Sequence, residues 1–437
     1  MKPGLYFITL LVAIIFATHS SAHAQANNNY LTDSAFVKWA TLNAVKLDKA
    51  NLSQINNTVG DARIVALGEP AHGLHEMLAL RNAIFKYLVE KKGFTTIVLE
   101  ANFAKCRVVS DYIAGGTGNI AQIAGALTIA KPTIDDIALI NWIRQYNQQP
   151  AHKNKLKFYG MDVQMVGFPG DTTPSHPAID AVLAYLKKVD PAEARRFEKM
   201  LAPFLPRMSV ANYPKLPKVE GDRLSRILDE LIGTIKNHQA NYIKAGTAQG
   251  YQLALQTAVV ARQTDQVVSV SPPETSAKIP PDAWRAITAR DSSMAENVRW
   301  IAAREKKVFV YSHNGHVKNA PTTGGDWDVL SKAPKVTGQF LRDFYGNKLV
   351  IFGISLPSTY GITQPNSLES ALTKVGRANF LLNLKSAATN PGAAQWLSEL
   401  RPMQANLVSF INLRLNIAFD AIIYMEKATP VERVTVN

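Results

Sequence analysis

The feature that most constrains the fold is a series of short apolar runs separated by segments with helical periodicity. The runs are rich in Val, Ile, Leu and Phe and nearly continuous, which is typical of strands buried on both faces of a parallel sheet. They occupy residues 63–67, 95–99, 155–159, 307–312, 348–354 and 421–424. Apolar residues at helical spacing lie within 75–91, 134–146 and 292–304. This alternation predicts an α/β fold with a central, mostly parallel or mixed sheet flanked by helices.

The middle of the chain has a different pattern, because strand signals stop near residue 177 and helical periodicity continues to residue 268. One helical stripe is formed by Leu224, Ile227, Leu228, Leu231, Ile232 and Ile235. A Pro-rich connection at 271–281 closes this region. We therefore expect residues 177–281 to form a helical insertion that roofs the site and divides the α/β core into 25–176 and 282–437.

The first 24 residues have the three parts of a secretory signal peptide. A positively charged start precedes an apolar run over residues 5–17, and the segment ends in the string Ala22-His23-Ala24. The run is shorter than the roughly 20 apolar residues that a membrane-spanning helix needs. We expect cleavage after Ala24 and a periplasmic or secreted protein without stable membrane insertion. An uncleaved N-terminal anchor is the alternative.

The charge of the chain is strongly positive, with 48 Lys and Arg against 34 Asp and Glu and a net charge of +14. Much of it falls on the predicted helical insertion, without the interleaved aromatic residues of a nucleic-acid groove. We therefore expect a solvated basic surface, a monomer and no nucleic-acid partner. The single cysteine, Cys106, excludes an intramolecular disulfide and a cysteine-rich metal cluster, and we interpret it as a packed thiol.

Carboxylates and imidazoles follow three of the predicted strands at the point where each strand ends. They are Glu69 and His72 after the first run, Glu100 after the second, and His313 and His316 after the fourth. In α/β sheets, ligands collect outside the carboxyl ends of the strands. We therefore expect these five side chains to share one site.

The sequence motifs of several other catalytic systems are missing. The chain has no G-x-S-x-G nucleophile elbow, no H-E-x-x-H zinc helix, and neither a Walker A loop nor G-x-G-x-x-G. What remains is chemistry by histidine and carboxylate, in which a neutral imidazole takes a proton from water and the hydroxide attacks an ester or lactone carbonyl. The oxyanion then requires positive charge or hydrogen-bond donors.

The same side chains are also ligand types that Zn²⁺ or Mn²⁺ accepts. A divalent metal held by Glu69, His72, Glu100, His313 and His316 would itself acidify a bound water. We expect hydrolysis without a metal or other cofactor, and the metal site is the open alternative.

Several strings along the chain together resemble the erythromycin esterase family. They are, in order, Gly68-Glu69-x-x-His72-Gly73-x-x-Glu76, Leu99-Glu100-Ala101-Asn102, Phe158-Tyr159-Gly160-Met161-Asp162, Arg290-Asp291-x-x-Met294-Ala295-Glu296-Asn297, His313-Asn314-Gly315-His316 and Phe419-Asp420-Ala421. Each string is short, but the ordered set runs from about residue 60 to 425. Pro70 departs from the pattern, since a small residue is expected there.

The resemblance implies an esterase that opens the macrolactone ring of 14-membered macrolides with an activated water. It implies that His72 is the general base, and that Glu69 and Glu100 orient the base or the water. The substrate would be a small molecule.

Three further residues complete the predicted site. The resemblance assigns Arg81, on the helix that follows the first motif, to the oxyanion, and it matches His313 and His316 to the paired histidines of the family. We interpret Arg290 as a structural residue at a helix start. Asp162, at the end of another predicted strand, is compatible with either role.

Two other functions stay open at this point. The chain could hydrolyse another ester, such as an acyl group on an envelope polysaccharide. It could also be a non-catalytic periplasmic binding protein whose basic helical region grips an anionic polymer. A histidine base with carboxylate partners disfavours pure binding.

Overall fold

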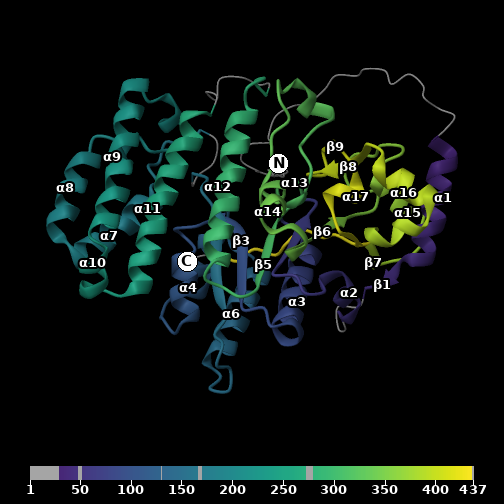
Figure 1. Cartoon of the computed structure of the whole chain (residues 1–437), viewed down its shortest axis with the longest axis horizontal. Helices are drawn as coiled ribbons and strands as arrows, with labels where there is room; N and C mark the ends of the chain where they lie inside the picture. The colour runs from purple at the N-terminus through teal and green to yellow at the C-terminus, as the bar shows by residue number, and fades with distance from the viewer. Residues whose placement is uncertain (1–28, 48–51, 129, 166–169, 272–278, 436–437) are drawn as a thin grey trace.

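The structure is a computed structural model that describes residues 29–47, 52–128, 130–165, 170–271 and 279–435. The predicted signal peptide at 1–24 lies outside these residues. Figure 1 shows a central sheet with helices around it and a further group of helices to one side. None of the helices in the described part of the chain is long and apolar enough to cross a membrane.

An eight-stranded sheet with the order β1-β7-β10-β6-β2-β5-β3-β4 forms the centre of the molecule. Its strands are β1 Val45–Lys46, β2 Ile64–Glu69, β3 Thr96–Asn102, β4 Lys157–Asp162, β5 Val308–His313, β6 Leu349–Ser355, β7 Phe380–Asn383 and β10 Ala421–Tyr424. The strands from β10 to β4 are parallel, whereas β7 and β1 pair antiparallel to their neighbours. All six predicted runs are strands of this sheet, so the predicted α/β fold is confirmed.

The helices follow the strands in three groups along the chain. The first part contains α1 Asn29–Asn43, α2 Asn56–Val59, α3 His75–Lys92, α4 Arg107–Ile113, α5 Ile120–Ala124 and α6 Ile134–Gln148. The middle contains α7 Pro177–Val189, α8 Pro191–Leu201, α9 Lys218–Asn237, α10 Gln239–Ala245 and α11 Ala248–Ser269. The last part contains α12 Trp284–Ala302, α13 Asn314–Val317, α14 Thr337–Tyr345, α15 Leu368–Thr373, α16 Pro391–Ser398 and α17 Leu415–Ala418. A separate hairpin, β8 Arg401–Ala405 with β9 Ser409–Leu413, was not predicted.

Alternate residues of the central strands point to opposite faces of the sheet and build two cores. On one face, Leu67 and Tyr311 pack with residues of α3 and α6. On the other face, Ala66 and Val310 pack with residues of α12. The carboxyl ends of β2, β3 and β5 can therefore combine side chains from both layers.

The middle helices form a group next to α12. Within the group α11 packs against α7 and α9, and it also packs against α12; Figure 1 shows the group on the left of α12. The boundaries at 177 and 281 and a roofing role for this region stay predictions.

The helix α12 differs from its prediction in one respect that matters for the site. It begins at Trp284, after Pro280 and Pro281, and not near Arg290. The predicted start was wrong because the two prolines mark the boundary. Arg290 therefore lies inside the helix, where its side chain reaches the sheet.

Candidate active site

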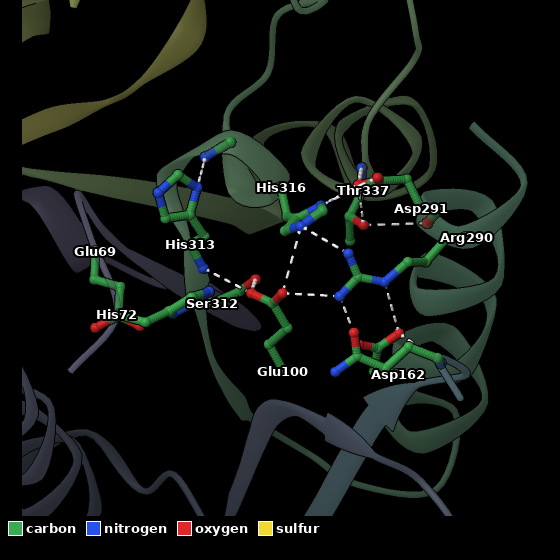
Figure 2. Close-up of polar contacts among 12 residues, drawn as sticks. Glu69, His72, Glu100, Asp162, Arg290, Asp291, Ser312, His313, His316 and Thr337 are labelled. Atoms are coloured by element: carbon green, nitrogen blue, oxygen red, sulfur yellow. Dashed lines mark hydrogen bonds and ion pairs between the residues drawn. The ribbon is translucent and has the colours of Figure 1, made fainter. Parts of the chain in front are cut away.

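Five of the predicted site residues lie together at the carboxyl ends of three adjacent strands. Glu69, the last residue of β2, is opposite His313, the last residue of β5. Glu100 lies in β3 on the other side of β5, and His316 lies in α13, directly after β5. His72 is in the loop between β2 and α3. Figure 2 shows Glu69 and His72 on the left of His313, with Glu100 and His316 on its right.

His72 and Glu69 form a hydrogen-bonded pair. The Nδ1 atom of His72 lies 2.5 Å from Oε1 of Glu69. The Glu69 side chain is 5% exposed, whereas the His72 side chain is 38% exposed. Within the described residues, Nε2 of His72 makes no polar contact, so it can exchange a proton with water or a bound molecule.

The surroundings of His72 favour its charged form. Burial opposes protonation, but the carboxylates of Glu69 and Glu100 outweigh it and raise the pKa of His72 to about 9. The charge of Arg290 acts in the opposite direction without cancelling this effect. The imidazole is therefore mostly protonated at neutral pH, and its neutral form increases toward alkaline pH.

Glu100 is the centre of the second half of the site. Its Oε2 atom accepts hydrogen bonds from Oγ of Ser312 at 2.6 Å and from the backbone N–H of His313 at 3.0 Å. Its Oε1 atom accepts one from Nη2 of Arg290 at 2.9 Å and lies 3.4 Å from Nε2 of His316. Burial alone would raise the pKa of Glu100, but the nearby histidines and Arg290 hold it well below its usual value. Glu100 is therefore a fixed carboxylate.

Arg290 joins Glu100 to a further strand of the sheet, as Figure 2 shows. Its Nε and Nη2 atoms donate to the two carboxylate oxygens of Asp162 at 3.0 and 2.6 Å. Asp162 is the last residue of β4 and is fully buried, and the Arg290 side chain is 12% exposed. The two-pronged contact fixes the guanidinium group. Arg290 is thus part of the site and not a residue at a helix start.

His316 is held by a buried carboxylate behind it. Its Nδ1 atom lies 2.9 and 3.1 Å from the two oxygens of Asp291. Oδ1 of Asp291 also accepts hydrogen bonds from the backbone N–H and the hydroxyl of Thr337, each at 2.7 Å. Burial opposes the charging of His316, but Asp291 and Glu100 outweigh it and its pKa is raised. His316 therefore bridges Asp291 and Glu100, and its Nε2 atom also lies 3.3 Å from Nη1 of Arg290.

His313 has both ring nitrogens bound to the backbone. Nδ1 accepts a hydrogen bond from the N–H of Gly315 at 3.0 Å, so Nε2 carries the proton and donates to the carbonyl of Pro70, also at 3.0 Å. Burial and the charge of His72 lower the pKa of His313 to about 3. A neutral ring with both nitrogens occupied holds the loop that carries His72, and is not available as a base.

Arg81 is buried beneath the site, and its side chain is 3% exposed. Its Nη2 atom lies 2.9 Å from Oδ1 of Asp136, and its Nε atom donates to Oδ1 of Asn82 at 3.0 Å. The guanidinium carbon lies 5.2 Å from the ring centroid of Tyr311. These contacts favour a positioning role, because stabilisation of an oxyanion requires donors that face the reacting group. The predicted oxyanion role stays a prediction.

Sequence reasoning missed several polar side chains of the site. They are Asp291, Tyr311, Ser312 and Thr337, whereas Arg290 had been interpreted as a structural residue. A signal existed for Tyr311 and Ser312, because they precede His313 in one strand and alternate side chains face the two layers. The contact of Asp291 with His316 depends on α14, which packs against both α12 and α13, and no spacing in the sequence specifies this.

The described part of the chain contains no group of three or more His, Cys, Asp or Glu side chains arranged to hold a metal ion. The carboxylates of Glu69 and Glu100 use both oxygens in contacts with the protein. Hydrolysis without a metal stays a prediction. Cys106 is buried, and burial raises the pKa of its thiol above the usual value, as expected of a packed thiol.

Three comparisons relate the chain to known proteins. A model of the family described as erythromycin esterase matches residues 89–428. The chain is 24% identical to erythromycin esterase type II of Escherichia coli over 411 residues, which are 87% of this chain and 93% of the relative. A crystal structure of a Bacillus cereus protein has a TM-score of 0.77 and 26% identity, covering 92% of this chain and 99% of that one. A mutant of the erythromycin esterase EreC in its open conformation has a TM-score of 0.67 and 18% identity, covering 91% and 98%.

Proposed function

Because the chain belongs to the erythromycin esterase family, we propose that it is a carboxylic ester hydrolase in which His72 is the general base. The finer part of the proposal is the substrate, the macrolactone ring of a 14-membered macrolide. One observation carries the proposed chemistry. It is an imidazole that is anchored to Glu69 through Nδ1 while its side chain stays 38% exposed.

The proposed reaction begins with neutral His72. Its Nε2 atom takes a proton from a water molecule, and Glu69 stabilises the resulting imidazolium through Nδ1. The water oxygen bonds to the ester carbonyl carbon and forms a tetrahedral oxyanion. When this intermediate collapses, the carbon–alkoxide bond breaks and the alkoxide oxygen receives the proton from Nε2. The products are a carboxylic acid and an alcohol, which in a macrolactone are the two ends of one opened chain.

Positive charge for the oxyanion is available from the second half of the site. Nη1 of Arg290 and Nε2 of His316 lie 3.3 Å apart there. Asp162 and Asp291 hold the two groups from behind, so the guanidinium charge and the imidazole are already in place before the reaction. We assign Glu100 to fixing Arg290 and His316 and not to proton transfer, because the pKa of Glu100 is held well below its usual value.

The base assignment predicts a pH profile. The pKa of His72 is raised to about 9, so the neutral form is about 1% of the protein at pH 7 and increases about tenfold per pH unit. We therefore expect kcat/KM to rise from neutral pH and to level off near pH 9. A profile that is flat across this range would contradict the assignment.

The substrate and the base are tested in one experiment. The protein is incubated with a 14-membered macrolide, and mass spectrometry follows the gain of one water. We expect His72→Gln to lower the rate by about 10²–10⁴-fold. The matched control is His75→Gln, because Nδ1 of His75 lies 2.9 Å from Oδ2 of Asp135 and its side chain is 42% exposed. This control should keep the wild-type rate.

The outcomes separate the two parts of the proposal. Turnover that persists in His72→Gln contradicts the assignment of His72 as the base. Loss of turnover in both variants would show that the effect of His72→Gln is not specific to the proposed base, and it too contradicts the assignment. A folded wild-type protein that adds water to no macrolide contradicts the substrate. Release of acid from an acylated polysaccharide would then favour the other ester.

Export is proposed from the sequence of the first 24 residues. The expected result is a protein in the periplasmic or medium fraction whose N-terminal sequence begins at Gln25. Recovery of the uncut chain would contradict cleavage after Ala24.

A further inference from the structure

Tyr311 contacts the oxygen of Glu69 that His72 does not use. Its hydroxyl donates to Oε2 of Glu69 at 2.5 Å, and His72 lies 2.5 Å from Oε1. Tyr311 is 4% exposed, and Glu69 is 4% exposed. The buried carboxylate is therefore held at one oxygen and presents the other to the proposed base.

The sheet explains why Tyr311 reaches this position. In the register of β2 and β5, Tyr311 is opposite Leu67 and His313 is opposite Glu69. Residues two apart in a strand face the same side, so Tyr311 stands one step below Glu69 in the same layer. Its ring also lies over the guanidinium group of Arg81, with the guanidinium carbon 5.2 Å from the ring centroid. Arg81, Tyr311, Glu69 and His72 therefore contact one another in series, and we call this series the stack.

The phenol of Tyr311 is a hydrogen-bond donor that keeps its proton. Burial and the charges of Glu69 and Asp136 raise the pKa of Tyr311 well above its usual value, and Arg81 offsets only part of this. The phenol is therefore neutral across the working range and can only donate to the carboxylate. An ion pair of 2.9 Å between Arg81 and Asp136 fixes the base of the stack.

We propose that Tyr311 is a positioning residue that holds Glu69, and through it the Nδ1–H of His72, so that Nε2 faces the reacting water. This inference rests on the proposed function for its catalytic consequence. It also assigns Arg81 to supporting the Tyr311 ring. The contact between Tyr311 and His72 is indirect, so the test must read the state of the imidazole itself.

Removal of the phenol hydroxyl should shift the pKa of His72 in a defined direction. In Tyr311→Phe, Glu69 loses a donor that stabilises its negative charge, so the carboxylate holds the imidazolium more strongly. The other charged groups that face His72 are Glu100 and Arg290, and neither is changed. We expect the pKa of His72 to rise by about half a unit or more. The less constrained pair should also lower kcat by about tenfold with little change in KM.

The experiment uses the protein labelled with ¹⁵N-histidine, and it follows the imidazole signals through a pH titration by NMR. The His72 signal is assigned by its loss in His72→Gln. The matched control is Tyr213→Phe, because the Tyr213 hydroxyl donates to the buried carboxylate of Asp265 at 2.8 Å among the middle helices. This control should leave the His72 titration and kcat unchanged.

A second variant keeps the test decisive if Tyr311→Phe does not fold. 3-Fluorotyrosine at position 311 has a more acidic phenol and is a stronger donor to Glu69. It should therefore lower the pKa of His72, the opposite of the expected effect of Tyr311→Phe. The two shifts of opposite sign support the proposal.

An unchanged His72 titration in the folded Phe or fluorotyrosine variant overturns the proposal, whatever happens to stability. If the wild-type protein hydrolyses no ester, the proposed function fails, but the NMR titration still decides whether Tyr311 acts on His72. An altered titration without any change in kcat would contradict the positioning role in catalysis.

Discussion

Arg290→Met is the substitution with the largest expected effect on stability among the site residues. The methionine keeps most of the side-chain volume but removes the charge that lies between Glu100 and Asp162. Those two carboxylates are 10% and 0% exposed, and Arg290 contacts them at 2.9, 2.6 and 3.0 Å. Loss of one partner from a buried ion pair leaves an uncompensated charge, which costs about 3–5 kcal/mol. We expect the free energy of unfolding to fall by that amount.

The measurement is urea unfolding at pH 7, followed by tryptophan fluorescence and circular dichroism so that coincident transitions can be checked. The control is Arg196→Met, because Arg196 also contacts two carboxylates, Glu193 and Glu230, but its side chain is 37% exposed. An exposed pair of this kind contributes about 1 kcal/mol or less. If Arg290→Met is no more destabilising than the control, the stabilisation argued for the ion pairs of Arg290 with Glu100 and Asp162 is wrong.

The pH dependence gives the same prediction an independent check. The folded-state pKa of Glu100 is held well below 4.5, so its stabilising contribution is present above pH 4.5 and is lost as the pH falls through the folded value. In Arg290→Met the carboxylate accepts a proton at higher pH. The difference in the free energy of unfolding between wild type and variant should therefore become smaller as the pH falls. The double variant Arg290→Met/Asp162→Asn should recover part of the loss, because it removes one stranded charge.

Three other predictions concern a buried lysine, two glycines and the metal requirement. Lys318 is fully buried, and burial lowers its pKa from 10.5 to about 7. Between these pH values the unfolded state therefore binds more protons than the folded state. The free energy of unfolding should rise from pH 7 to 10.5 in the wild type but not in Lys318→Met. In Gly338→Ala the new Cβ would lie 1.8 Å from the carbonyl oxygen of Val317, so we expect a lower Tm, whereas Gly221→Ala, with open space around its Cβ on helix α9, should raise it slightly. Ester hydrolysis should survive exhaustive dialysis against EDTA; activity that disappears and returns only with added Zn²⁺ or Mn²⁺ would contradict the prediction of metal-independent hydrolysis.

The predictable strands are those that are buried and consist of continuous apolar runs. β2 and β6 are buried at every position, and both were predicted. β8 was missed because it contains Pro402 and Gln404, and it lies in a two-stranded sheet that packs against helix α15. Local pattern therefore specified the central sheet but not the hairpin.

The site was predictable where a strand end carried the chemistry directly. Glu69, Glu100 and His313 follow apolar runs, and the sheet brings them together. Arg290 could not be placed in the same way, because its position depends on the phase of a helix that starts six residues earlier, at Trp284. The predicted helical segment covered residues 292–304, so Arg290 lay outside it and was not assigned to the face that packs on the sheet.

The two halves of the site differ in a way that decides where proton transfer can occur. In one half the carboxylates of Glu100, Asp162 and Asp291 contact Arg290 and His316, and these contacts fix the positions of all five side chains. The other half is the pair of Glu69 and His72, where one ring nitrogen is bound and the side chain is exposed. A group whose charge is locked by several buried partners loses proton-exchange capacity, because any change of protonation breaks those contacts. Proton transfer is therefore expected at His72, and the other half supplies N–H groups whose positions are fixed.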